Sequence, residues 1–500
     1  MDFLFYNLES SNFKFFCYFF LPLFLIFFTF VFQMLNIEIK KAYNFNLFFL
    51  SISFFFCINM LLYFFDSSDI WGLPLEYQFD LMISPSLNYS IPVGVDSLSI
   101  WFVVLNHLIM YLCVLYTYST NNKQYGILYC LLLLQWGVGS AFMVFDILGF
   151  FIFFELTLIP IYLVILLYGS RERKIRASYL ISLYTLFGSI FMLFNILYCF
   201  SKYGTTNFFH LLSLDFNPED AKFLWFTFFI AFAAKIPMIP FHIWLPEAHV
   251  EAPTIGSVIL AALLLKLGTY GIIRFLLFLF PDATLFFSPI INVFALISVV
   301  FTSLTAIRQI DLKKIIAYSS IGHMNVVLLG LLVPSVESLE GSIFQMLSHG
   351  IVSGALFFLV GAFYQRYKVR SLEYFGGFMI TAPLLASFFL IFSMANISFP
   401  GTSSFVGEFM ICFGLFEYNS FAVIIACINM VTGAVYTLWA LNRVNFGNLK
   451  SSFILNYGDL NRLEFYIFSL LTFIMLVMGI YPNFILGILH SSTHYLSLII

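Results

Sequence analysis

The stretch FAAKIPMIPFHIWLPEAHVEAPTIGSVILAALLLKLGTYG, from Phe232 to Gly271, contains the features that decide the fold. Most of it is apolar enough for a membrane, yet Lys235 and Lys266 lie within its apolar runs, and Pro237 and Pro240 closely follow the first lysine. A proline removes a backbone N–H and clashes with the carbonyl four residues earlier. Inside a bilayer such a break is tolerated only where protein or water satisfies the freed backbone groups. The stretch therefore predicts a broken membrane helix beside a buried lysine.

The composition of the whole chain indicates a polytopic membrane protein. Of its 500 residues, 62% are hydrophobic and 9% are charged, whereas soluble domains carry about 25% charged residues. The net charge of −3 argues against a nucleic-acid partner. The seven cysteines lie too far apart for a CxxC-type zinc or iron–sulfur motif, and neither a Walker A motif nor a GxGxxG turn is present. Any redox or nucleotide chemistry is therefore expected on another chain.

Fourteen segments are long and apolar enough for a membrane helix, which needs about 20 residues. We therefore expect an all-α polytopic membrane protein with these transmembrane helices: 13–35, 45–65, 97–118, 125–145, 147–168, 176–200, 222–245, 254–279, 285–307, 312–333, 342–364, 379–416, 420–442 and 464–488.

Basic residues orient these spans, because connections on the inner side of a membrane are enriched in Lys and Arg. If both termini lie outside, 16 of the 22 basic residues fall in inner connections, and only Lys14, Lys202 and Lys222 fall outside. We therefore expect both termini on the outer side.

The N-terminal region and the phenylalanine content suggest where the chain is made. Asp2 and Glu9 are acidic, and no arginine lies near them, which does not fit a transit peptide or a cleaved signal. The bias toward 69 phenylalanines indicates synthesis inside an organelle. We expect a multi-pass protein of the mitochondrial inner membrane, with the bacterial plasma membrane as the alternative.

Four ionisable residues lie inside predicted spans: Glu155, Lys235, Lys266 and Glu408. A charge at mid-membrane costs about 2.5–3.5 kcal/mol on insertion scales, so such residues are rarely accidental. They are either structural salt bridges between helices or sites of proton transfer. Burial disfavours the charged form of lysine and glutamate and a nearby opposite charge favours it, so a partner that comes and goes can switch protonation.

Three histidines extend this pattern. His323 and His349 are each the only ionisable group in the middle of their spans, and His242 lies seven residues after Lys235, on the same face if that helix were unbroken. Each is either a packing residue or a member of a proton relay. The hydroxyls of Ser319, Ser320 and Ser348 would support both roles.

A second broken helix indicates an inverted repeat. Pro400-Gly401 lies near the middle of the long span 379–416, just before Glu408. The two broken spans are five apart, and an odd offset reverses orientation. Two inverted five-helix units, about 125–279 and 285–442, are typical of secondary transporters. We divide the chain into N-terminal helices and an outer loop (1–90), a core (91–443), and a C-terminal loop with a last transmembrane helix (444–500).

The quoted stretch closely resembles the signature of the antiporter-like subunits of respiratory complex I. FFELTLIPIYLVI, GSRERKIRASY, DLKKIIAYSSIGHMNVV, QMLSHGIVSGALFFLVG and FPGTSSFVGEF resemble the same group, and the resemblance runs from about Ile91 to Arg443. It implies a proton-pumping subunit in the membrane arm of an NADH:ubiquinone reductase. The family's ionisable positions fall on Glu155, Lys235, Lys266 and Glu408, and its relay histidines on His323 and His349.

The resemblance also implies cofactors and partners. The chain itself would carry no redox centre, and flavin, iron–sulfur clusters and quinone would be bound by partner chains. Those partners would be the other membrane-arm subunits, including sister antiporter-like subunits, within the membrane lipids. The free energy of quinone reduction elsewhere in the complex would drive protons through this chain.

Two other functions stay open. A subunit of a multi-subunit cation/proton antiporter would use the same ionisable residues. A structural membrane subunit that transports nothing would not need four buried charges. A haem-binding subunit with His323 and His349 as ligands lacks any second supporting feature.

Overall fold

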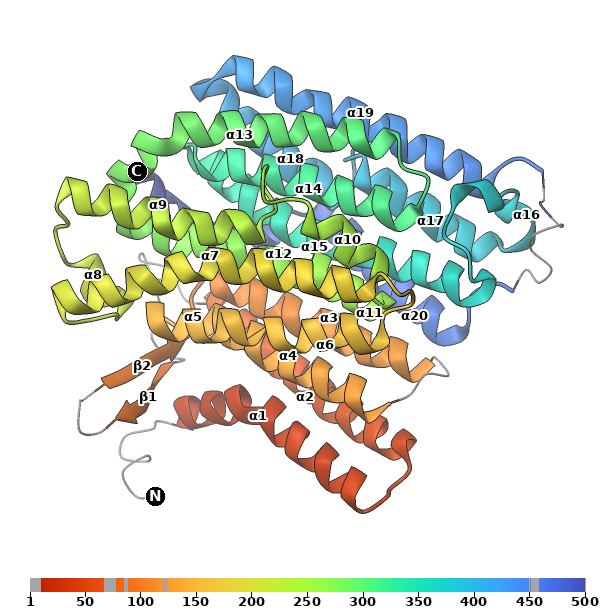
Figure 1. Ribbon diagram of the computed structural model, residues 1–500, viewed down its shortest axis with the longest axis horizontal. Coiled ribbons are helices and arrows are strands. Elements are labelled where there is room, and N and C mark those ends of the chain that lie inside the picture. The colour runs from red at the N-terminus through yellow and green to blue at the C-terminus, as the bar shows by residue number, and fades with distance from the viewer. Residues whose placement is uncertain are drawn as a thin grey trace.

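The computed structural model describes residues 10–66, 78–84, 89–119, 124–448, 450 and 458–499. Within these ranges the chain is a bundle of helices that run side by side, with one two-stranded sheet at the end of the bundle (Figure 1). Twelve helical segments are long and apolar enough to cross a membrane. They are α1 (Ser10–Met34), α2 (Ile39–Asp66), α3 (Ser99–Ser119), α4 (Tyr125–Met143), α5 with α6 (Ile147–Leu156, Leu158–Tyr168), α7 (Lys174–Tyr203), the α11–η4 segment (Thr254–Leu277), α13 (Pro281–Ile307), α14 (Leu312–Leu331), α15 (Val336–Tyr367), α19 (Ser420–Asn445) and α20 (Arg462–Ile480).

The two predicted spans outside this set are both broken, as their prolines indicate. The first consists of α9 (Pro218–Lys235) and α10 (Trp244–Glu251), and the second of α17 (Pro383–Asn396) and α18 (Ser403–Tyr418). Side chains satisfy backbone groups at the first break, where the indole of Trp244 donates to the Ala234 carbonyl over 2.9 Å. Gly401 lies in the second break with a φ of 93°, which a residue with a Cβ rarely adopts. Both predicted interruptions are confirmed, and the total of fourteen spans stays a prediction.

The span that carries Lys266 has an irregularity that the sequence does not predict. Its α-helical parts, α11 (Thr254–Ile259) and α12 (Leu265–Gly271), alternate with π-helical turns, η3 (Leu260–Leu264) and η4 (Ile272–Leu277). A π-turn holds one more residue than an α-turn and is often found at functional sites. Here the two π-turns lie on either side of the buried lysine.

Short elements cover the ends of the bundle. The strands β1 (Gln78–Ser84) and β2 (Tyr89–Gly94) form an antiparallel hairpin, which the all-α expectation missed. α8 (Phe208–Leu212), η5 (Leu372–Tyr374) and α16 (Phe378–Thr381) lie in connections. A separate helix, α21 (Asn483–Ile499), follows α20 and begins within the last predicted span, 464–488, which therefore ends earlier than expected. This last helix was not expected.

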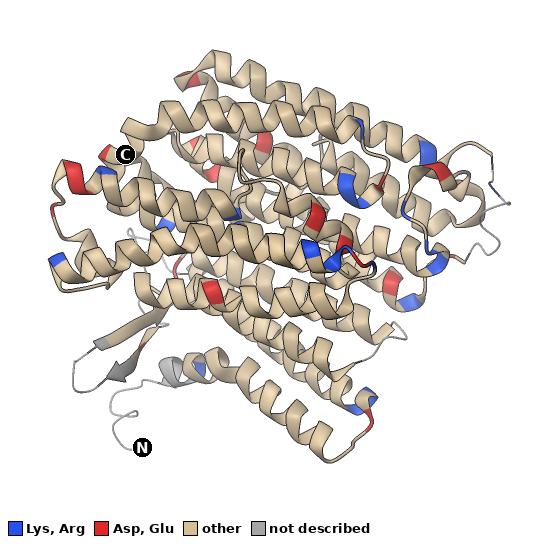
Figure 2. Ribbon diagram, in the orientation of Figure 1, with Lys and Arg blue, Asp and Glu red and all other residues tan. Residues whose placement is uncertain are grey.

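The two ends of the bundle differ in charge. The start of α1, the C-terminus, the hairpin and α8 lie at one end (Figure 1). Lys and Arg gather mainly at the other end, around the α6–α7 connection and α16 (Figure 2). This arrangement agrees with the orientation expected from the sequence, in which both termini lie on the side opposite most of the Lys and Arg residues. One of the counted residues, Lys123, lies outside the described residues.

Two isolated β-bridges support the predicted repeat. One joins Asp146, at the start of the fifth predicted span, to Asn207, just after the sixth. The other joins Asp311, at the start of the tenth, to Ser371, just after the eleventh. The two bridges are thus related by the same offset of five spans as the two broken helices. The repeat itself stays a prediction.

Candidate functional site

Glu408 lies on α18 just after the second break, and its side chain is 2% exposed. Its Oε1 lies 2.6 Å from Nδ1 of His323 on α14 and accepts a hydrogen bond from Nε2 of Gln345 over 3.2 Å. Its Oε2 accepts from the hydroxyl of Ser398, a residue of the break, over 2.6 Å. The break therefore supplies a donor to the carboxylate, as does α15, while α14 places a histidine against it.

Lys266 is fully buried on α12, between the two π-turns. Its Nζ donates to the Ala261 carbonyl over 2.7 Å and lies 2.7 Å from Nδ1 of His349 on α15. The ring of His349 lies 5.8 Å from that of His323, measured between centroids. Both Nε2 atoms are buried, and neither has a hydrogen-bond partner among the described residues. The four side chains thus form one cluster, Lys266–His349–His323–Glu408, which we call the central cluster.

Glu155 and Lys235 form a second, separate pair of groups. The Lys235 Nζ donates to the Phe154 carbonyl over 3.1 Å and lies 3.3 Å from the centroid of the Phe154 ring. Within the described part of the chain, Oε1 of Glu155 is buried without a hydrogen-bond partner, while the carboxyl group interacts electrostatically with Lys235 and with the hydroxyl of Ser189. Among the described residues, no ion pair within 4.0 Å joins the two. The expected pair is therefore close but not in direct contact.

His242 is not brought to either group by a hydrogen bond in the described chain. It is half-buried in the first break, its Nδ1 has no partner, and its ring lies 5.5 Å from that of Phe301. The face it would share with Lys235 exists only in an unbroken helix, and α9 ends at Lys235.

Two further buried ionisable residues, which were not among the candidates from the sequence, lie beside the central cluster toward the end of the bundle rich in Lys and Arg. Lys313, counted above with the inner connections, is 1% exposed, and its Nζ donates to the Ala252 carbonyl over 2.7 Å and to Ser257 Oγ over 2.9 Å. His249 is buried against Phe357 and interacts electrostatically with both Lys313 and Lys266. Helical spacing gave no signal for Lys313, because ten residues place it about 80° around the helix from His323.

This combination of features defines a class of protein: a helical membrane bundle, two broken helices, and buried lysine, histidine and glutamate side chains in contact. The chain belongs to the family described as NADH:quinone oxidoreductase/Mrp antiporter, whose model matches residues 144–437.

Three known proteins resemble this chain over most of its length. NADH-ubiquinone oxidoreductase chain 4 of Marchantia polymorpha is 48% identical over 82% of this chain and 83% of its own length. A chain of respiratory complex I from Thermus thermophilus, solved with bound NADH, is 26% identical, with a TM-score of 0.85 over 97% of this chain and 99% of its own. A chain of the Mrp complex from Dietzia sp. DQ12-45-1b has a TM-score of 0.84 at 18% identity, over 97% of this chain and 98% of its own. The last likeness concerns the fold alone.

Proposed function

We propose that the chain is the chain-4 subunit of an NADH–ubiquinone oxidoreductase and moves protons through the central cluster. The observation that carries this proposal is the direct contact of Lys266 with His349 and of His323 with Glu408, two buried pairs whose imidazole centroids lie 5.8 Å apart. Structural ion pairs explain single buried charges, but four ionisable groups from four helices in one cluster suit proton transfer better. In this proposal, flavin, iron–sulfur clusters and quinone are bound by partner chains.

Proton transfer needs hydrogen-bonded contacts or a single intervening water. In the hydrogen bond between Lys266 and His349, the proton can lie on either nitrogen. In the bond between His323 and Glu408, it can lie on the imidazole nitrogen or on the carboxylate oxygen. One water between the two imidazoles would complete the path, since each ring has an unpartnered Nε2. Glu408 is then the terminal group, and Ser398 stabilises its carboxylate when the proton has left.

We place proton uptake on the inner side, through Lys313, Ser257 and His249. The Lys313 ammonium donates to the Ser257 hydroxyl, and that hydroxyl donates to the carbonyl of His249 over 3.1 Å. Because His249 interacts with Lys313 and with Lys266, it lies where a proton from the inner face would pass to the central cluster.

We assign Glu155 and Lys235 the role of a switch beside this path. Lys235 bonds a neutral carbonyl, while the adjacent carboxylate retains an unpartnered oxygen. A small change in the conformation of the Lys235 side chain would exchange the Phe154 carbonyl for the Glu155 carboxylate as its partner. This exchange would change the electrostatic potential at Lys266. Within the proposed assembly this pair would respond to the neighbouring membrane-arm subunit, and the whole would lie in the mitochondrial inner membrane.

The replacement Glu408→Gln tests this function against a purely structural role. Its control is Glu417→Gln, which removes a carboxylate from an exposed position on the same helix. Both complexes are purified and reconstituted in sealed vesicles, and NADH-driven proton uptake is measured. We expect Glu408→Gln to assemble and to slow proton transfer by about 100-fold or more, because general acid–base groups contribute factors of that order. If the chain had only a structural role, the assembled complex would pump protons normally with either replacement.

A further inference from the structure

A cavity of about 290 Å³ lies among the inner ends of the membrane helices, apart from the central cluster. Residues at the ends of α3, α6 and α15 and at the starts of α4, α11 and α14 line it. Its lining includes Tyr116, Tyr168 and Tyr364. Tyrosines are enriched where the hydrocarbon meets the lipid headgroups, so the cavity lies at headgroup depth on the side rich in Lys and Arg.

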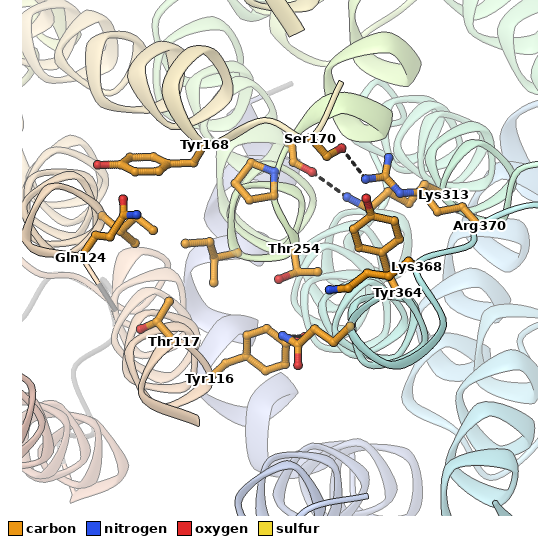
Figure 3. A pocket seen from close by; sticks show the side chains of 15 residues that line it. Tyr116, Thr117, Gln124, Tyr168, Ser170, Thr254, Lys313, Tyr364, Lys368 and Arg370 are labelled. Carbon is orange, nitrogen blue, oxygen red and sulfur yellow. Dashed lines mark hydrogen bonds between the residues drawn. The ribbon is translucent and has the colours of Figure 1, made fainter. Parts of the chain in front are cut away.

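The cavity concentrates positive charge. Lys313, Lys368 and Arg370 all line it, and none of the lining residues is Asp or Glu. Figure 3 shows these three cations at one side of the cavity, with Tyr168 and Gln124 across from them. Lys368 is exposed, whereas the other two cations are buried. A ligand arriving from the inner face would therefore meet three cations, one from α14 and two from the connection that follows α15.

Neighbouring carboxylates do not neutralise this charge. Glu251 interacts with both Lys313 and Arg370, but it is a single negative charge, and Arg171 adds a further positive charge beside Arg370. The hydrogen bonds that the two buried cations make go to uncharged groups. Arg370 donates to the Val250 carbonyl and the Ser170 hydroxyl, and Lys313 donates to a carbonyl and a hydroxyl.

A buried donor without a partner is also present. Arg370 is 3% exposed, and its Nε has no hydrogen-bond partner among the described residues. The central carbon of its guanidinium lies 4.2 Å from the centroid of the Tyr364 ring, a cation–π contact. A buried donor left unpaired costs about 1–3 kcal/mol, so a ligand that accepts a hydrogen bond here would be favoured.

We propose that this cavity binds the phosphate group of an anionic ligand at the inner face of the membrane. A phosphate offers several acceptor oxygens to donors that converge from different elements, which matches Lys313, Lys368 and Arg370. Basic pockets between membrane helices on this side are known to hold phospholipid headgroups. The same chemistry would also fit free phosphate, so the experiment separates these two sources.

The first experiment measures how fast an amine-reactive reagent modifies Lys368 in the assembled complex, by mass spectrometry. Lys314, which lies outside the cavity lining on the same helix turn as Lys313, serves as the internal reference. One arm compares bilayer discs of phosphatidylcholine with discs that also contain phosphatidylglycerol. The other arm compares inorganic phosphate with chloride at equal ionic strength in lipid-depleted detergent.

Slower modification of Lys368 relative to Lys314 is expected in at least one arm. Protection by phosphatidylglycerol alone assigns the site to a lipid headgroup, protection by phosphate alone assigns it to the free anion, and protection in both assigns it to either. If neither arm protects Lys368, or if Lys314 is protected equally, the proposal is overturned.

A second measurement uses variants, with phosphatidylglycerol and phosphate retention by the purified complex as the readout. Lys368→Gln should weaken retention about fivefold, the equivalent of the ~1 kcal/mol that one basic residue contributes near an anionic surface. The control Arg443→Gln removes an exposed charge on the same side, from α19 outside the cavity. Equal losses in the two variants would mean that general surface charge holds the anion, which would also overturn the proposal.

Discussion

Replacing Lys266 by methionine separates proton transport from stability. Methionine is unbranched and of similar length, so it fills the same space without the charge. The Ala261 carbonyl and Nδ1 of His349 would each lose a donor, at about 1–3 kcal/mol apiece. Against this, the replacement removes the cost of burying an ammonium group, which is several kcal/mol. We therefore expect a net change in stability within about 2 kcal/mol and normal assembly.

Proton transport by the Lys266→Met complex, unlike its stability, should change strongly. Without Lys266 no ionisable group of the cluster lies between His249 and His349, so proton-coupled turnover should fall by about 100-fold or more. The assay measures NADH oxidation and proton uptake of the reconstituted complex in sealed vesicles, with assembly checked on a native gel. Lys222→Met, at the exposed outer start of α9, is the matched control. Normal proton uptake per NADH by an assembled Lys266→Met complex would refute the reasoning.

Two further replacements test the neighbouring features. Glu155→Gln should assemble normally yet reduce proton uptake per NADH in sealed vesicles. The reason is that Glu155 is the carboxylate that interacts electrostatically with Lys235. Unchanged proton uptake would contradict the proposed switch. Gly268→Ala should lower the thermal stability of the complex by about 1–3 kcal/mol, because a Cβ there would lie 2.8 Å from the Ile236 side chain and 3.2 Å from the Phe232 carbonyl. Gly433→Ala, where a Cβ would lie 3.6 Å from the nearest neighbouring atom, should leave the melting temperature unchanged if close packing is the cause.

The sequence predicts the features of this fold that depend on local chemistry. Both breaks follow from prolines, since a proline disrupts a helix wherever it lies. The buried charges were equally visible, because Glu155 and Glu408 are flanked by apolar residues on both sides. Spacing along the chain also placed the histidines inside spans, although it did not identify their partners.

What the sequence did not reveal depends on contacts between distant segments. The Lys266–His349 bond joins residues 83 positions apart, and no periodicity encodes which histidine meets which lysine. Lys313 was missed because a basic residue near the end of a span usually faces water, whereas here it points into the protein. The contact expected between Glu155 and Lys235 is shifted because the ammonium bonds the backbone carbonyl of Phe154 instead of the carboxylate.

The π-turns beside Lys266 bear on how the length of this helix can vary during evolution. Each π-turn holds one residue more than a regular turn of the same path requires. A related chain that lacks one residue within 260–264 would therefore keep a continuous helix, with Lys266 still directed toward His349. It would lose the wide turn in which the Lys266 ammonium reaches the Ala261 carbonyl, five residues earlier in the chain. Single-residue deletions in related chains are therefore expected within 260–264, although a buried membrane helix otherwise tolerates few insertions or deletions. In each such chain, the lysine that corresponds to Lys266 would lack the backbone carbonyl that accepts its hydrogen bond here.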